Sequence, residues 1–407
     1  MKFNASFWIR LSIFNLFIVA FLGVIMRYKI GFDFPYLNQK NIQHAHSHFA
    51  FLGWVTHTLY VLMVNYLSQR LSVFDFSKYR KYIVINLALS YGMLISFFFT
   101  GYSIVSIVCA TLTIVNNSFL AYCFFSDFKK IGQYSPSIAW FKSALWFNLI
   151  SSLGTFYLAY MMASKNFNEH LYLASVYFYL HFQYNGFFIF VCVGLLLDHL
   201  PVLIQGYTYN KNVFKLFFIS CIPSYFLSTL WANLPVWLYI IVVISAFMQV
   251  IAMVLLFKSM WIGLKNSSVL NSFGKLLLLF VALAFSAKIT LQLGSTIPEL
   301  SKLAFGFRPV VIAYLHLVLL AVVSGFLITF LFIRGILINS ISMKTAIGTF
   351  FIGILLNEVI LAVQGIASFS YLPVKYVNEM LFAISLLLLT GAIMMVLAQR
   401  KSQEPLA

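Results

Sequence analysis

The chain has 407 residues, of which 62% are hydrophobic and only 9% are charged. A soluble domain carries roughly 25% charged residues, so this composition excludes an ordinary soluble enzyme and favours lipid as the solvent. The net charge of +17 does not indicate nucleic-acid binding, because the basic residues lie in short loops between apolar spans.

Apolar segments of about twenty residues follow one another along the chain without period-two alternation, which is typical of transmembrane helices. The sequence therefore predicts an all-α, polytopic membrane bundle of about twelve transmembrane helices. We expect a single integral membrane domain over residues 1–407. The expected spans are residues 7–26, 44–66, 82–101, 104–126, 138–163, 173–197, 213–231, 236–257, 275–294, 309–333, 345–366 and 378–398.

The orientation of the spans follows from the basic residues in the loops. The even-numbered loops are rich in them, with Arg70, Lys78, Arg80 and Lys81 in the second loop. Because cytoplasmic loops carry the excess of Lys and Arg, we expect both termini in the cytoplasm, and the bacterial inner (plasma) membrane as the location. The second, sixth and tenth spans then begin on the outer face.

Those three spans carry an internal repeat. Each contains a [His/Tyr]-x-His pattern, and a small residue follows five positions after the second histidine. The repeated histidines, which are 133 and 135 residues apart, are His48, His181 and His316. This spacing predicts three units of four helices around a pseudo-threefold axis, over about 1–130, 131–265 and 266–407.

Intramembrane histidines are costly, so they face a bundle interior and are functional hypotheses by default. Neutral imidazole is a common ligand for transition metals and haem iron. We therefore treat His46, His48, His181 and His316 as candidate haem or metal ligands. Residues two apart on a helix point about 200° apart, so His46 and His48 are expected to face different neighbours. The alternative for each histidine is a buried ring bonded to a nearby carbonyl.

The residues His46 and His48, followed by Leu52-Gly53-Trp54, resemble the His-x-His helix of the haem–copper oxidase superfamily. The cbb-type oxidases and nitric oxide reductases are the most similar members. The segment from Gln43 to His48 is also similar to the His-Ala-His segment of the NnrS family of twelve-helix haem proteins. The shared topology covers nearly the whole chain, whereas the specific motif covers only about ten residues.

The resemblance implies a haem, of b-type, with ligands on the second and tenth helices and a copper or iron ligand on the sixth. His48 with His316 is the first pairing it suggests. A pairing of the His-x-His helix with His181, or two haems, stays open. Arg308 becomes a candidate partner for a haem propionate, and copper or a second metal near His57 is a weaker expectation.

The chain departs from the oxidases in three ways. In the oxidases the His-x-His pair lies on the tenth helix, whereas here it lies on the second. The seventh span, from Phe214 to Trp231, lacks histidine, and Tyr184 lies three rather than four residues after His181. A complete binuclear centre is therefore not expected, and no catalytic residue is assigned. The expectation is a degenerate oxidoreductase-like haem protein that transfers electrons or handles nitric oxide or oxygen, with a protein electron donor and a small gas ligand as partners.

Two further buried groups support other interpretations. Lys288 and Glu358 lie deep in their spans and are predicted to form a buried ion pair, either structural or part of a proton relay. Such groups in a repeated helical bundle also favour the alternative function, a secondary transporter of unknown substrate. A diiron desaturase or hydroxylase fits less well, because the histidines cluster on the outer side.

Overall fold

The computed structural model describes residues 3–132, 135–199, 211–265 and 270–400. Within these residues the regular elements are all helices and no strand occurs. The first half contains α1 (Ala5–Gly31), α2 (Gln39–Phe49), η1 (Ala50–Thr56), α3 (His57–Arg70), α4 (Ser77–Thr100), α5 (Ile104–Phe128), α6 (Pro136–Ser164), α7 (Glu169–His181), η2 (Phe182–Phe188) and α8 (Ile189–His199). The second half contains α9 (Lys211–Cys221), η4 (Pro223–Ala232), α10 (Val236–Lys265), α11 (Ser272–Gly294), α12 (Pro298–Gly306), α13 (Arg308–His316), η5 (Leu317–Ser324), α14 (Gly325–Ile333), α15 (Ile341–Phe369) and α16 (Val377–Arg400).

Within the described residues, eleven helical stretches are long and apolar enough to cross a membrane. The all-α class and the character of an integral membrane protein are thereby confirmed. The predicted span at 138–163 does form a helix, α6, but it is not among the eleven. The α6 sequence contains Lys142, Asn148 and several serines among its apolar residues. The all-helical class is thus established, whereas the prediction of about twelve spans stays a prediction.

The helix ends follow ordinary capping chemistry. Asn4, Asn38 and Asn271 each accept a hydrogen bond from the first turn of the helix that follows. Ser103 forms a reciprocal capping box with Ser106 at the start of α5. These side chains satisfy backbone N–H groups that a helix leaves unpaired, so they fix where the spans begin.

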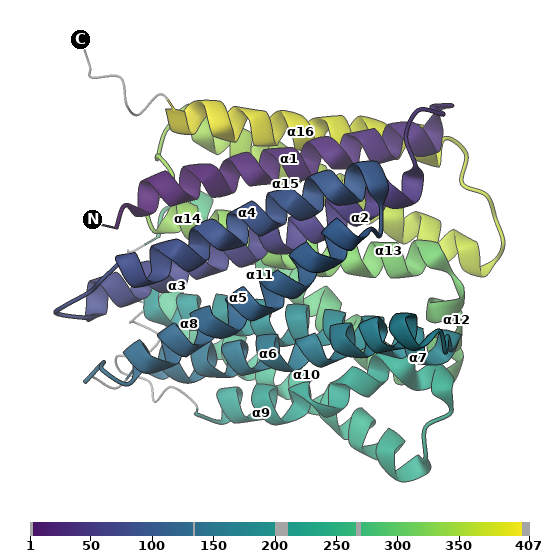
Figure 1. The fold of residues 1–407 in the computed structure, drawn as a ribbon, viewed down its shortest axis with the longest axis horizontal. Helices are drawn as coiled ribbons and strands as arrows, with labels where there is room; N and C mark the ends of the chain where they lie inside the picture. The colour runs from purple at the N-terminus through teal and green to yellow at the C-terminus, as the bar shows by residue number, and fades with distance from the viewer. Residues whose placement is uncertain (1–2, 133–134, 200–210, 266–269, 401–407) are drawn as a thin grey trace. The chain divides into compact units, whose positions relative to one another are not determined.

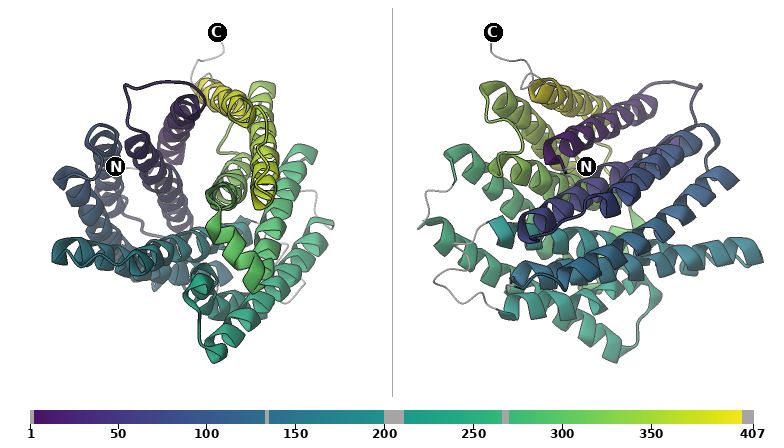
Figure 2. Two further views of the ribbon diagram at one scale, coloured as in Figure 1. Left: turned by 90° about the vertical axis from the view of Figure 1, so that its right-hand side faces the viewer. Right: turned by 60° about the vertical axis from the view of Figure 1, so that its left-hand side comes forward.

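The chain divides into two compact units. Unit 1 comprises residues 1–134, 327–364 and 373–407, and unit 2 comprises residues 135–326 and 365–372. In unit 1, α1 lies along α16, and α4 packs against both α2 and α5 (Figures 1 and 2). In unit 2, α6 packs against α7, η2 and α8, while α10 packs against α9 and α11 (Figure 1). The prediction of one domain with three repeat units stays a prediction.

Three of the long helices contain a π-helical segment: η1, η2 and η5. At the end of each segment, a backbone N–H donates to the carbonyl five residues earlier. The three pairs are His57 to Leu52, Ile189 to Tyr184, and Gly325 to Leu320. Long π-helical segments are rare and occur frequently at functional sites. The α-helices on either side of each segment continue in the same direction, so each α–π–α helix forms one candidate membrane span.

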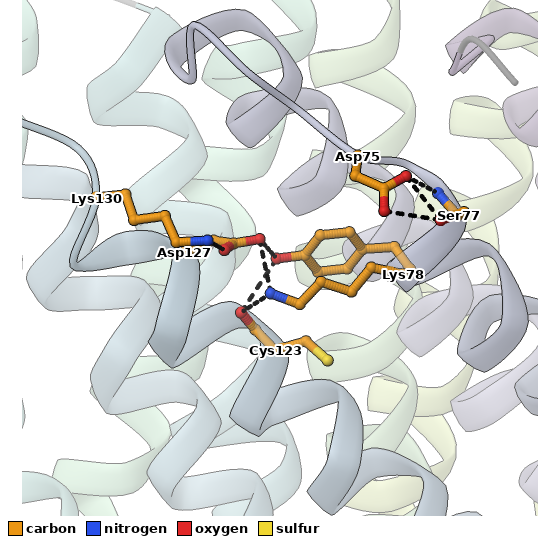
Figure 3. Close-up of polar contacts among 7 residues, drawn as sticks. Asp75, Ser77, Lys78, Cys123, Asp127 and Lys130 are labelled. Atoms are coloured by element: carbon orange, nitrogen blue, oxygen red, sulfur yellow. Dashed lines mark hydrogen bonds and ion pairs between the residues drawn. The ribbon is translucent and has the colours of Figure 1, made fainter.

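In unit 1, a buried carboxylate joins α4 to α5 near their ends. The Asp127 side chain is 7% exposed and forms ion pairs with Lys78 at 3.0 Å and Lys130 at 2.7 Å. It also accepts a hydrogen bond from the hydroxyl of Tyr79 at 2.6 Å (Figure 3). Because every member of this group is paired, we regard it as a structural contact rather than as a site.

Candidate functional site

Each of the three repeated histidines lies shortly before a π-helical segment. His48 lies two residues before η1, while His181 and His316 lie directly before η2 and η5. The small residue five positions later falls inside the π-helical segment in all three cases, as Gly53, Gly186 and Ala321. The sequence pattern thus coincides with a repeated local structure.

Close packing explains the small residues. A Cβ atom on Gly186 would lie 2.5 Å from Cβ of Phe147 on α6, and one on Gly53 would lie 2.6 Å from the ring of Phe49. Ala321 is buried, at 1% exposure. A neighbouring side chain therefore occupies the space next to each glycine, and a larger residue would displace it.

In unit 1, His46 and His48 contact different neighbours, as their spacing of two residues predicts. Nδ1 of His46 lies 3.1 Å from the carbonyl oxygen of Val19 on α1. The His48 ring stacks on Phe97 of α4, with centroids 4.5 Å apart and planes 8° apart. Because a carbonyl oxygen only accepts, Nδ1 of His46 carries the proton, and Nε2 carries the lone pair of the neutral ring.

In unit 2, both ring nitrogens of His181 are engaged in hydrogen bonds. Nε2 donates to the carbonyl of Cys221 at 2.8 Å, and Nδ1 accepts from the side-chain amide of Asn185 at 3.0 Å. The ring is 1% exposed. His181 could bind a metal only by giving up one of these bonds, so the structure favours the alternative of a satisfied buried histidine.

The break between α9 and η4 explains why the Cys221 carbonyl is available to His181. At Pro223 the chain changes from α-helix to the 3₁₀ helix η4, so the N–H of Tyr225 donates to Ile222, three residues earlier, at 3.3 Å instead of to Cys221. The Cys221 carbonyl accepts instead from His181 and from the hydroxyl of Ser224, at 3.0 Å. The sequence shows Pro223, but it does not show that the freed carbonyl meets a histidine 40 residues away.

His316, at the end of α13, resembles His46 in its hydrogen bonding. Its Nδ1 lies 2.9 Å from the carbonyl oxygen of Ile312, four residues earlier, so Nδ1 again carries the proton. Arg308 is the first residue of α13 and its side chain is exposed. The assignment of Arg308 to a propionate stays a prediction.

The described residues contain no group of three or more His, Cys, Asp or Glu side chains arranged to hold a metal ion. A haem needs only one or two imidazoles from the protein, so this finding does not bear on haem ligation. The pairing of His48 with His316 stays a prediction, because the two residues belong to different units.

The predicted Lys288–Glu358 pair also involves both units and stays a prediction. Lys288 on α11 is 2% exposed, and its Nζ lies 5.8 Å from the ring centroid of Phe285. Glu358 on α15 accepts a hydrogen bond from its neighbour Asn357 at 3.1 Å.

Sequence reasoning missed the partners of the buried groups. In unit 1, Asn15 and Asn86 donate to the backbone carbonyls of Gly53 and Leu52, at 2.6 and 3.3 Å. His57 is fully buried beside Trp8, with ring centroids 6.1 Å apart, and neither ring nitrogen has a hydrogen-bond partner among the described residues. Polar side chains inside apolar spans were the available signal, but their partners depend on which helices are neighbours.

No protein-family model matches this chain, and no curated protein matches its sequence.

Proposed function

We propose that this protein binds haem inside the membrane through imidazole ligands, and that it serves electron transfer or the handling of nitric oxide or oxygen. The first candidate ligands are His46 in unit 1 and His316 in unit 2. The observation that carries the proposal is the hydrogen bond from Nδ1 of each ring to a backbone carbonyl.

Histidines that bind metals almost always donate their second ring N–H to a carbonyl, carboxylate or water, which fixes the tautomer and the orientation of the ring. His46 and His316 fit this arrangement, with Nε2 as the nitrogen that carries the lone pair. His181 does not fit it, because its two nitrogens are committed to Cys221 and Asn185. His48 remains a candidate, and its ring stacks on Phe97 beside His44.

A bound haem would supply one-electron chemistry and, at an open iron site, binding of a small gas. The contribution of this chain would be to orient the imidazoles and to exclude water. The excess of Lys and Arg in alternate loops supports the inner membrane as the location, with both termini in the cytoplasm.

The test is to purify the protein in mild detergent and to record visible spectra when oxidised, reduced, and reduced with carbon monoxide. A Soret band that sharpens and gains an alpha band on reduction would support paired imidazoles. A shift with carbon monoxide would indicate an open iron site. The proposal fails if the protein carries no haem and binds none when haem is added.

Matched variants sharpen this test. His46→Ala and His316→Ala are each expected to lower the haem content or to convert the spectrum to that of iron with one ligand lost. His170→Ala, at an exposed position on α7, serves as the control and is expected to keep the spectrum. His181→Ala is also expected to keep it, measured at a temperature at which this less stable variant stays folded. The opposite pattern, with His181 needed and His46 dispensable, would reject this ligand assignment but not haem binding itself.

A secondary transporter is the second candidate. It is supported by the buried amine of Lys288 and by the helix interrupted between Cys221 and Pro223, because transporters place binding sites at broken helices with buried charges. Absence of any haem spectrum would make this the leading hypothesis. The next measurement would then be substrate-dependent uptake into proteoliposomes, compared between wild type and Lys288→Met.

A further inference from the structure

A small cavity lies inside unit 2, beside the hydrogen bonds that hold His181. Its volume, measured for the centre of a water molecule, is about 10 Å³. A cavity needs about 10–15 Å³ on this measure to hold one water. Its polar lining residues come from four different elements, namely Asn185, Cys221, Gln249 and Lys288.

The directions of the surrounding hydrogen bonds are determined by the Cys221 carbonyl, which can only accept. Nε2 of His181 and the hydroxyl of Ser224 must therefore both donate to it. Once Nε2 carries the ring proton, Nδ1 is an acceptor, so Asn185 must turn its amide nitrogen toward the histidine.

The same reasoning fixes Gln249. The hydroxyl proton of Ser224 is committed to Cys221, so Ser224 can only accept from the side chain of Gln249. The amide nitrogen of Gln249 therefore lies at the hydroxyl, at 2.9 Å. Neither amide can be turned around without breaking one of these bonds.

In this arrangement, two buried acceptor oxygens, Oδ1 of Asn185 and Oε1 of Gln249, have no hydrogen-bond donor among the described residues. Both residues line the cavity and are only 5% and 4% exposed. A buried polar atom without a partner is costly, which means that a donor is expected in the cavity.

Lys288 is the other polar group that lines the cavity. It is buried, and the described lining contains no carboxylate that could neutralise it. The Cys221 thiol at the end of α9 also lines the cavity, and His181 at the end of α7 donates to the Cys221 carbonyl. The Tyr184 and Tyr225 rings lie 6.5 and 6.1 Å from the His181 ring. An amine in this position needs hydrogen-bonding partners that the apolar residues around it, such as Phe285, do not provide.

We propose that Lys288, Asn185 and Gln249 form a buried binding site for one water molecule. The water donates its two hydrogens to Oδ1 of Asn185 and Oε1 of Gln249 and accepts one from Nζ of Lys288. Three partners is the usual number for a buried water. The bound water hydrates the amine within the membrane span and, through Asn185, connects it to the hydrogen bonds of His181. The proposal is independent of haem binding.

The test uses two buried cysteines of unit 2. Cys221 lines the cavity and is 2% exposed, whereas Cys192 on α8 is 6% exposed and does not line it. X-ray radiolysis produces hydroxyl radicals from bound water, and these label adjacent side chains. The full chain is irradiated in heavy-oxygen water, and mass spectrometry measures the label at each cysteine.

We expect Cys221 to be labelled about fivefold faster than Cys192, because only Cys221 lies beside an ordered water. Lys288→Met and Gln249→Leu are each expected to reduce the rate at Cys221 to that at Cys192. Lys275→Met, at an exposed position on the same helix, is the control and is expected to change neither rate.

Equal labelling of the two cysteines in the wild-type protein would overturn the proposal, and this comparison requires no variant to fold. A rate at Cys221 that both cavity variants leave unchanged would overturn it as well. A density map at high resolution gives an independent readout, in which a water is expected within hydrogen-bond distance of all three groups.

Discussion

The two fully buried histidines of the long interrupted helices contrast sharply. His181 in unit 2 uses both ring nitrogens, bonded to Cys221 and Asn185, while His57 in unit 1 has no partner for either nitrogen among the described residues. Both rings are at most 1% exposed. Burial alone therefore does not tell which histidine is structural, because the hydrogen-bond partners decide that.

The π-helical segments η1 and η2 also differ in how they are hydrogen-bonded to neighbouring helices. In unit 1 the neighbouring helices donate to the backbone of η1, through Asn15 and Asn86. In unit 2 the segment η2 uses its own side chains instead, since Gln183 donates to Asn148 and Ser151 of α6, both at 2.8 Å. The same local backbone structure thus accepts hydrogen bonds from its neighbours in unit 1 and donates hydrogen bonds to its neighbour in unit 2.

The largest expected effect is that of His181→Leu. This change removes two buried hydrogen bonds and leaves the Asn185 amide without its acceptor, so we expect a loss of about 2–4 kcal/mol in the free energy of unfolding. The measurement is a denaturant titration in mixed micelles, with exposed His170→Leu as the control. A loss below about 0.5 kcal/mol, the range of a surface substitution, would remove the contrast between the two histidines.

Gly186→Ala is expected to have the next largest effect. The new methyl group would lie 2.5 Å from Cβ of Phe147, which cannot move without its helix, and such overpacking costs about 1–3 kcal/mol. Gly53→Ala meets the far ring atoms of Phe49, which can tilt, so its cost is expected to be smaller. Thermal unfolding of both variants in the same detergent tests this order, and equal costs would contradict it.

His57→Leu is expected to leave stability unchanged or to raise it by up to about 1 kcal/mol, because the apolar side chain has no unpaired nitrogens to bury. The same denaturant titration measures this change. A loss of stability instead would indicate that His57 has a partner in the protein as isolated, such as a metal or water, and the spectrum of the variant would then identify which.

The smallest effect is expected at Asp75, in the loop before α4. Its carboxylate accepts hydrogen bonds from the Ser77 hydroxyl at 2.7 Å and the Ser77 N–H at 2.9 Å, which lower the pKa of Asp75 below its ordinary value (Figure 3). A lowered pKa in the folded state stabilises the protein above the unfolded pKa, and this stabilisation is lost as pH falls through the folded pKa.

Wild type and Asp75→Asn are therefore expected to differ slightly in melting temperature near neutral pH and to converge as pH falls from about 5 to 2. The carboxylate is exposed, so water screens the effect. A difference in melting temperature that grows as pH falls would contradict a lowered pKa of Asp75 in the folded protein.

The sequence by itself determined the helical class, the places of the spans, and the coincidence of a histidine with a small residue five positions later. It also determined that His46 and His48 face different neighbours, because the helical repeat fixes the angle between residues two apart. These are local properties, and they depend on hydrophobic pattern and backbone geometry.

Only the tertiary structure decided what each histidine does. The bond from His181 to Cys221 spans 40 residues and exists because Pro223 interrupts a neighbouring helix. Asn185 and Gln249 line one cavity because α10 packs against α9 and η4, and Cys221 at the end of α9 accepts the hydrogen bond from His181. Such contacts join segments far apart in the chain, and their hydrogen-bond directions follow from the full set of neighbours rather than from any single span.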